Sequence, residues 1–385
     1  MDLTQVWKVP LKIFGMTLFA FVSFLVILFL FGAFFISAGL GLGSMLGRES
    51  LAEVVSTEEQ GYAFLSGKNG SRNILVSLPV EGVILGSPPQ ELSASPIGWF
   101  NATYGYAIQR ALEKAADDEK VKGVFLHIQS PGGTIFGSMA IHEGIKAFQK
   151  STGKPVLAFI EGLAASGGVM AMVGADAIYA DYGSYIGSIG VMGAALTYYN
   201  QPTATEGGIL GGGIVTRGGI EQTVISAGRG KDLGNPFRRP TEEEIQTLQQ
   251  GADAEYANFV RHVSENRKIS EPTLRDRMGA QIFDNRTAET LGLIDGTLNR
   301  NDAVAKLAEM AGVAEDYQLA RPRRAPTRMW QELLFSTGLG GSMDEAHRAA
   351  VWSQVCLAAG RMPMAYYGDL EALCAECVRA DRAHP

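Results

Sequence analysis

The sequence predicts an α/β domain with buried parallel strands, preceded by one N-terminal transmembrane helix. Two observations predict the domain. Short apolar runs alternate with amphipathic segments from residue 73 to about 295, and turns rich in Gly and Pro separate them. A third observation predicts the membrane helix, because no charged residue occurs between Lys12 and Arg48. About 20 apolar residues span a bilayer core, and this run is longer.

The apolar segment 13–38 also exceeds the apolar region of a cleaved signal peptide, which is about 7 to 15 residues long. We therefore expect a retained helix within residues 13–40. Lys8 and Lys12 precede it, and such lysines favour the cytoplasmic side, so residues 49–385 are predicted to be extracytoplasmic. The formal net charge of −7 argues against a nucleic-acid partner.

The elements of the domain are predicted in chain order. Residues 49–72 are mixed and polar and suit a linker, and residues 73–85 predict a strand pair or one bent strand. Helical spacing predicts helices, and short apolar runs predict strands, one of which is interrupted by the sequence SPGG. The helices are expected at 106–118, 138–150 and 165–175, and the strands at 121–129, 154–162 and within 176–199.

The rest of the chain has weaker signals. The glycine-rich stretch 206–219 predicts a mobile loop or a hairpin, residues 222–228 a strand, and 229–239 a loop. Thr241 is expected to open a long helix in a capping box with Glu244. We predict four parts of the chain: an anchor (1–48), a linker (49–72), a catalytic domain (73–324) and a tail of short helices (325–385).

Ser166 is a candidate nucleophile because it lies among small residues in the sequence EGLAASGGVMA. A serine nucleophile needs a base, donors for the oxyanion and room for the substrate. Gly167 and Gly168 leave room, and the Gly167 N–H lies beside the hydroxyl. The glycines of SPGG, Gly132 and Gly133, are expected at a strand end and could supply a second donor. The alternative is that Ser166 is a helix N-cap and SPGG an ordinary turn.

The residues alone leave two candidates for the base. His127 lies in the strand before SPGG, although the alternation of its neighbours points it into a sheet layer. His142 and His262 are expected on the polar faces of helices. Lys231 follows the apolar run 222–228, and burial would have to lower its pKa from about 10.4 toward 7. The alternative is a solvated turn in which Lys231 pairs with Asp232.

Several motifs follow one another along the chain: SPGG, ASGG, the IGSIGV run, the pattern around Lys231 and the LGLID sequence. Together they resemble the bacterial signal peptide peptidase A family of membrane-anchored Ser/Lys proteases, from about residue 73 to 295. The resemblance implies a Clp protease/crotonase-like fold, a spiral of ββα units. It further implies that Ser166 is the nucleophile, Lys231 the general base and Ser188 the hydroxyl that orients the lysine. The N–H groups of Gly133 and Gly167 would form the oxyanion hole.

The resemblance also implies a function and a location. The expected substrates are remnant signal peptides or other membrane-derived peptides, cleaved by a homo-oligomer on the periplasmic side of the bacterial inner membrane. No cofactor or metal is expected, since no Cys/His cluster has zinc spacing. Val169 and Met170 stand where family members often have aromatic residues. Two alternatives are a crotonase-like acyl-CoA enzyme and an inactive membrane scaffold of the same fold.

Overall fold

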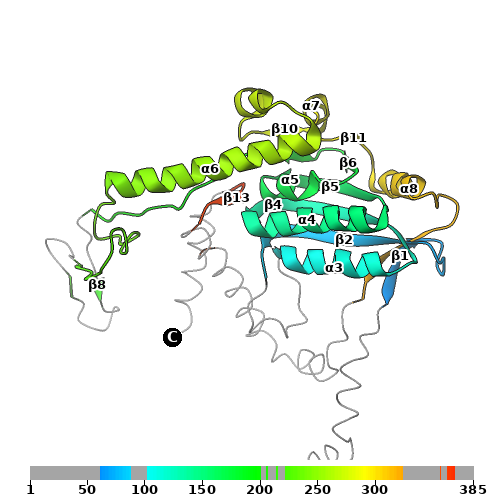
Figure 1. Cartoon of the computed structure of the whole chain (residues 1–385), viewed down its shortest axis with the longest axis horizontal. Helices are drawn as coiled ribbons and strands as arrows, with labels where there is room; N and C mark the ends of the chain where they lie inside the picture. Colours follow the sequence, from blue (N-terminus) through cyan, green and yellow to red (C-terminus); the bar gives the residue numbers. More distant parts are fainter. Residues whose placement is uncertain are drawn as a thin grey trace, which may run out of the picture. The chain divides into compact units, whose positions relative to one another are not determined.

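A mixed sheet forms the centre of the protein (Figure 1). The computed structural model describes residues 61–87, 102–200, 205–206, 214–215, 222–323, 356 and 362–368. The strand order is β1 (Tyr62–Gly67), β12 (Gln318–Pro322), β2 (Ile74–Leu85), β4 (Val121–Thr134), β5 (Val156–Ala165), β6 (Ala177–Ala180) and β11 (Gly296–Thr297). Every neighbouring pair from β12 to β11 is parallel, which confirms the predicted α/β class with buried parallel strands.

Four short strands extend this sheet beside its main path. They are β3 (Ala102–Tyr104) on β2, β7 (Tyr185–Gly187) between β5 and β10 (Ile282–Asp284), and β13 (Met364–Tyr366) on β4. Strands β8 (Thr205–Glu206) and β9 (Ile214–Val215) pair antiparallel. The glycine-rich stretch therefore contains a hairpin, one of the two predicted possibilities.

Helices cover both faces of the sheet, so its strands are buried on two sides. Strand residues such as Val124 and Leu126 pack in one apolar cluster with α3 (Gly105–Asp117) and α4 (Ile135–Thr152). Their neighbour Phe125 packs in a second cluster with α8 (Arg300–Met310) on the opposite face. Because side chains alternate along a strand, burial on both faces requires the continuous apolar runs seen in the sequence.

The long helix α6 (Glu242–Arg267) begins with the predicted capping box. The Glu244 N–H donates to Thr241 Oγ1 at 3.2 Å, and the Thr241 N–H donates to a Glu244 carboxylate oxygen at 2.8 Å. The buried side chains of α6 all lie in its C-terminal half: Phe259, Val260 and Val263. The N-terminal half consequently extends away from the sheet (Figure 1). Two further helical segments follow, a π-helix (Thr273–Met278) and α7 (Asn285–Thr290).

Three sequence predictions differ from the structure. SPGG does not end its strand, because β4 continues to Thr134 across a register shift. The Ser130 hydroxyl bonds to backbone groups where the register shifts. It donates to the Gly82 carbonyl at 2.6 Å and accepts from the Gly132 N–H at 3.0 Å. Residues 193–199 and 222–228 are irregular rather than extended strands. β propensity forms a strand only where a neighbouring strand is present to pair with it.

The sheet also reaches beyond the predicted catalytic domain on both sides. Strand β1 lies within the predicted linker and pairs with β12, and β13 belongs to a tail predicted to be helical. Cys356 in this tail is disulfide-bonded. Among the described residues, no helix combines the length and apolar character needed to cross a membrane. The predicted membrane helix at 13–40 falls outside the described residues.

Candidate active site

Ser166 occupies a strained turn between β5 and α5 (Gly167–Met172). Its φ of 51° and ψ of −111° lie outside the regions that L-residues favour, and such backbone costs about 1 to 3 kcal/mol. Neighbours hold the turn: the Ser166 N–H donates to the Gly187 carbonyl at 2.8 Å, and its carbonyl accepts from Met170 N–H at 3.0 Å. Ser166 therefore occupies the N-cap position of α5, as one sequence interpretation had it, but its side chain does not cap the helix. Its hydroxyl donates instead to the Gly190 carbonyl at 3.3 Å.

Two glycines approach each other directly beside Ser166. A Cβ atom built on Gly167 would lie 3.0 Å from the Gly133 nitrogen and 2.5 Å from Ser138 Oγ, and one built on Gly133 would overlap the Ile84 carbonyl oxygen. Neither position therefore accepts a side chain without movement of the backbone. The structure brings together Ser166 and the two predicted oxyanion donors, Gly133 and Gly167, as catalysis of acyl transfer requires.

Ser188 lies on the loop that holds Ser166. It directly follows Gly187, which bonds to the Ser166 N–H, and its own carbonyl accepts from the Gly190 N–H at 2.9 Å. Ser188 is buried and has a φ of 56°, and its N–H donates to the Gln281 carbonyl at 2.6 Å. The predicted orienting hydroxyl is thus placed in the same neighbourhood as the predicted nucleophile.

Lys231 is not brought to Ser166 within one chain. Its exposed turn is fixed to the start of α6, because Arg238 bonds both Asp232, at 2.7 Å, and Glu244, at 2.7 Å. These bonds from Arg238 lower the pKa of both carboxyl groups, that of Glu244 to about 2. Asp232 therefore pairs with Arg238 and not with Lys231, contrary to one sequence interpretation.

The length of α6 shows how far the Lys231 loop lies from Ser166. At the other end of this helix, His262 Nε2 lies 2.9 Å from the carbonyl of Met170, the residue that bonds to Ser166. The 18 residues from Glu244 to His262 span about 27 Å at 1.5 Å per residue. A lysine side chain cannot cover that distance. The nucleophile and the predicted base of one chain therefore lie at opposite ends of α6.

The three histidines that the structure describes make their contacts with groups other than the Ser166 hydroxyl. His127 is buried on the α8 face of the sheet, where its Nε2 lies 2.8 Å from a Glu161 carboxylate oxygen and its ring stacks on Phe159. The prediction that it points into a sheet layer is confirmed. His142 and His262 are not on solvated polar faces: their rings meet edge to face at 4.3 Å between α4 and α6. That prediction is wrong because α6 packs against α5 here, which places the His262 ring on His142 and buries His142.

The burial of His142 against His262 leads us to expect that the stability of the fold depends on pH. Burial, then His262 and Lys146, lowers the pKa of His142 from 6.5 to about 3, and its Nδ1 has no partner among the described residues. Below about pH 6.5 His142 is protonated in the unfolded chain but stays neutral in the folded chain. The free energy of unfolding therefore falls as the pH drops toward 3. We expect a loss of about 1 to 2 kcal/mol between pH 7 and 5. Urea unfolding of the wild type and His142→Leu measures it, and equal losses in both would contradict it.

Comparisons with known proteins identify the family. The family model of peptidase family S49 matches residues 148–314, and that of Clp protease matches residues 102–179. A provisionally named protease of Synechocystis is 31% identical over 54% of this chain and 70% of its own length. The chain belongs to peptidase family S49, a family of serine proteases, and has the α/β fold of the Clp protease/crotonase type.

Two further relatives show how far the similarity extends. A provisionally named protease of Methanocaldococcus jannaschii is 35% identical over 53% of this chain. The matched region covers 60% of that relative, less than two thirds of its length. A provisionally named signal peptide peptidase of Enterococcus faecium is 26% identical over 67% of this chain and 72% of its own length.

Proposed function

We propose that this protein is a serine peptidase in which Ser166 attacks peptide carbonyl groups. The observation that carries the proposal is the strained, buried turn at Ser166, with the N–H groups of Gly133 and Gly167 beside it. A strained strand-to-helix turn is a recurring way to present a serine nucleophile. The backbone donors would stabilise the negative charge that develops on the carbonyl oxygen.

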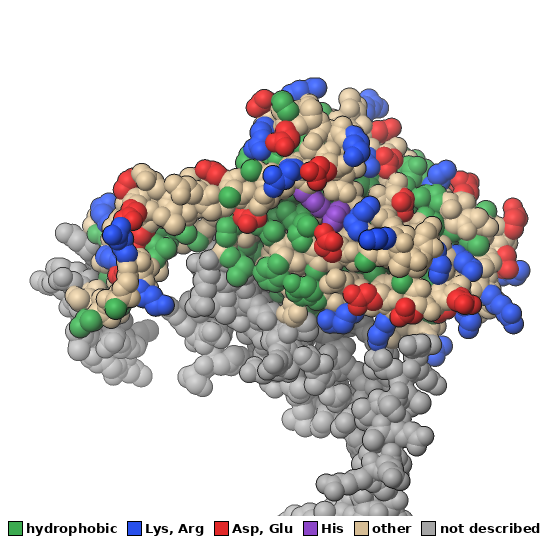
Figure 2. All heavy atoms as spheres, in the orientation of Figure 1, with side chains coloured by type: hydrophobic (Ala, Val, Ile, Leu, Met, Phe, Trp, Pro, Cys, Tyr) green, Lys and Arg blue, Asp and Glu red, His purple; other side chains and the backbone are tan. Residues whose placement is uncertain are grey.

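The proposed base is Lys231 of a second copy of the chain. Lys231 is exposed, and its loop is fixed to the start of α6 near Glu244. Met170, in the helix that follows Ser166, contacts His262, about 27 Å further along α6. Hydrophobic side chains gather under α6 where it leaves the sheet (Figure 2). The hydrophobic side chains of Met192, Leu233 and Ile245 are exposed in the single chain. Monomers rarely leave such a surface uncovered. A neighbouring copy covering it would bring Lys231 of one chain near Ser166 of another.

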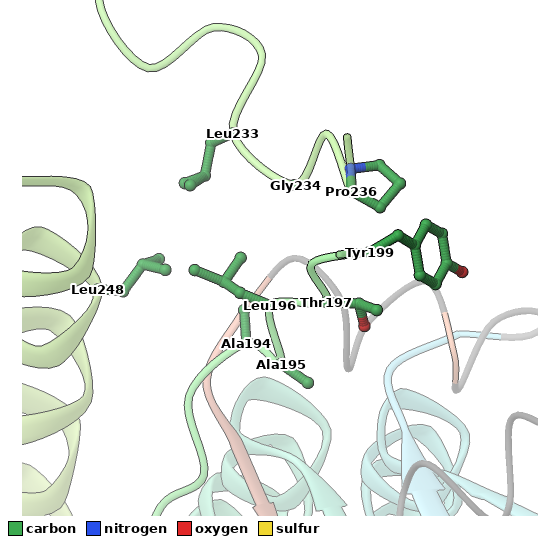
Figure 3. A pocket seen from close by; sticks show the side chains of 9 residues that line it. All are labelled: Ala194, Ala195, Leu196, Thr197, Tyr199, Leu233, Gly234, Pro236 and Leu248. Atoms are coloured by element: carbon green, nitrogen blue, oxygen red, sulfur yellow. The ribbon is translucent and has the colours of Figure 1, made fainter. Parts of the chain in front are cut away.

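A cavity beside the N-terminal half of α6 supports the proposal that this part of the chain is an assembly surface. It has a volume of about 510 Å³ between α6, the segment 194–199 and the Lys231 loop (Figure 3). The residues that line it are Ala194, Ala195, Leu196, Thr197, Tyr199, Leu233, Gly234, Pro236 and Leu248. Assembly would bury the Lys231 amine, and Ser188 would orient it.

The proposed reaction has two steps. Neutral Lys231 accepts the Ser166 proton as Oγ bonds to the carbonyl carbon, and the same proton passes to the departing amine as the peptide bond breaks. Water then attacks the resulting acyl-enzyme, giving a carboxyl product and restoring the Ser166 hydroxyl. Gly133 and Gly167 would stabilise the oxyanion in both steps. No other reactant is needed for the atoms to balance.

The proposed substrates are remnant signal peptides or other membrane-derived peptides. The predicted membrane helix at 13–40 supports this proposal, because it would hold the catalytic domain at the bilayer surface. The naming of the Enterococcus faecium relative as a signal peptide peptidase supports it as well. Lys8 and Lys12 favour an extracytoplasmic catalytic domain.

Labelling with a fluorophosphonate probe tests the proposed function. The probe reacts with an activated serine, so we expect labelling of the assembled wild type at Ser166, identified by peptide mass. Labelling should drop at least about tenfold in Lys231→Ala, since the base is removed. An acyl-CoA enzyme with a carboxylate base, or an inactive scaffold, would give no Lys231-dependent labelling of Ser166.

A further inference from the structure

The groove beside Ser166 already holds a strand of the same chain. Strand β13 pairs antiparallel with the end of β4, with Met364 opposite Thr134 and Ala365 opposite Gly133. The Tyr367 N–H extends this pairing by donating to the Pro131 carbonyl at 2.8 Å. The segment 362–368, here called the tail strand, therefore lies along the backbone that contains the proposed oxyanion donor.

A second backbone segment holds the other edge of the tail strand. Met364 exchanges two hydrogen bonds with Met192, of 2.9 and 3.0 Å. Met192 lies two residues after Gly190, whose carbonyl accepts a hydrogen bond from the Ser166 hydroxyl. Met364 and Ala365 are 1% and 0% exposed. The tail strand thus fills the space between two backbone edges that both adjoin Ser166, the geometry by which a groove binds an extended peptide.

The Ala365 carbonyl oxygen lies beside Gly167 and Gly132. A Cβ atom on Gly167 would lie 2.9 Å from this oxygen, and one on Gly132 would overlap it. Hydrogen-bonded pairs alternate along an antiparallel ladder, so the bond from Tyr367 to Pro131 implies that the Gly133 N–H faces the Ala365 carbonyl two residues away. The oxygen therefore lies against both proposed oxyanion donors.

We propose that the tail strand is an internal competitor that occupies the peptide groove and must leave before a substrate binds. The identity of the groove rests on the proposed function. Because the competitor is tethered, its effective concentration is of millimolar order, which weakens the apparent affinity of any free peptide. In this arrangement the Ala365 carbonyl would take the place of a substrate carbonyl, while the same chain's Lys231 is held at the far end of α6.

Peptide binding to full-length chains tests the competition without catalysis. Every chain carries Ser166→Ala, and the probe is a fluorescent peptide with the sequence of residues 361–369, measured by anisotropy. Tyr367→Pro removes the N–H that bonds Pro131 and places a proline ring in the ladder, so it weakens the tail strand. The matched control, Tyr367→Ala, removes the partly exposed side chain and keeps the N–H.

We expect Tyr367→Pro to bind the peptide at least about fivefold more tightly than Tyr367→Ala, since a weaker competitor is easier to displace. Met364→Pro, which loses the N–H bonded to Met192, should do the same if Tyr367→Pro folds poorly. Equal affinity in the proline and alanine variants would overturn the proposal. Such a result would leave the proposed function intact, because fluorophosphonate labelling of Ser166 tests that function separately.

Discussion

Replacement of Ser166 by alanine is expected to lower peptidase activity at least about a thousandfold, because no other group can form the acyl-enzyme. The fold should survive. The Ser166 side chain makes one long hydrogen bond, at 3.3 Å, and the bonds that hold the turn come from its backbone. Hydrolysis of an unstructured peptide substrate measures the activity, and thermal unfolding measures the stability.

A second buried serine provides the matched control. The Ser184 hydroxyl donates to the Ile160 carbonyl at 3.2 Å and accepts from the Gly162 N–H at 3.0 Å. Ser184→Ala should therefore cost about 1 to 3 kcal/mol of stability and leave turnover within a few-fold of the wild type. Turnover that persists in Ser166→Ala and falls in Ser184→Ala would remove Ser166 from the nucleophile role.

Replacement of Lys231 by arginine should be nearly as damaging to activity. Arginine keeps its charge at every working pH and cannot accept the Ser166 proton. At every pH where the wild type is active, the kcat/KM of Lys231→Arg should remain near background. Since Lys231 is exposed in the single chain, its replacement should leave the stability of the isolated chain unchanged.

Arg229 is the matched control on the same loop. It is exposed and forms a surface ion pair with Glu243 at 2.8 Å, worth at most about 1 kcal/mol. Arg229→Ala should therefore keep the wild-type kcat/KM. If Lys231→Arg retains wild-type turnover, another residue is the base.

The features that were predictable from sequence depend on local signals. The buried parallel strands appear as continuous apolar runs, and the capping box at Thr241 requires only its own first turn. The turn at Ser166 was predictable because the surrounding glycines and alanines allow close backbone contact. In each case, residues close in the sequence determine the local structure.

The features that were missed depend on partners distant in sequence. Strand β13 has only three residues and pairs with β4 about 230 positions away, so no periodicity marks it. The burial of His142 depends on α6, which covers it from more than 100 positions further along the chain. The separation of Lys231 from Ser166 follows from the direction of α6, which its capping box does not specify.

The central claim is that Ser166 and Lys231 form one catalytic site contributed by two copies of the chain. Mixing Ser166→Ala chains with Lys231→Ala chains, each inactive alone, tests it most directly. In an equal mixture the intact Ser166 and intact Lys231 should meet at about a quarter of the sites of a head-to-tail assembly. We predict recovery of peptidase activity to about that fraction of the wild type. A mixture that assembles normally and stays as inactive as its components would contradict the account.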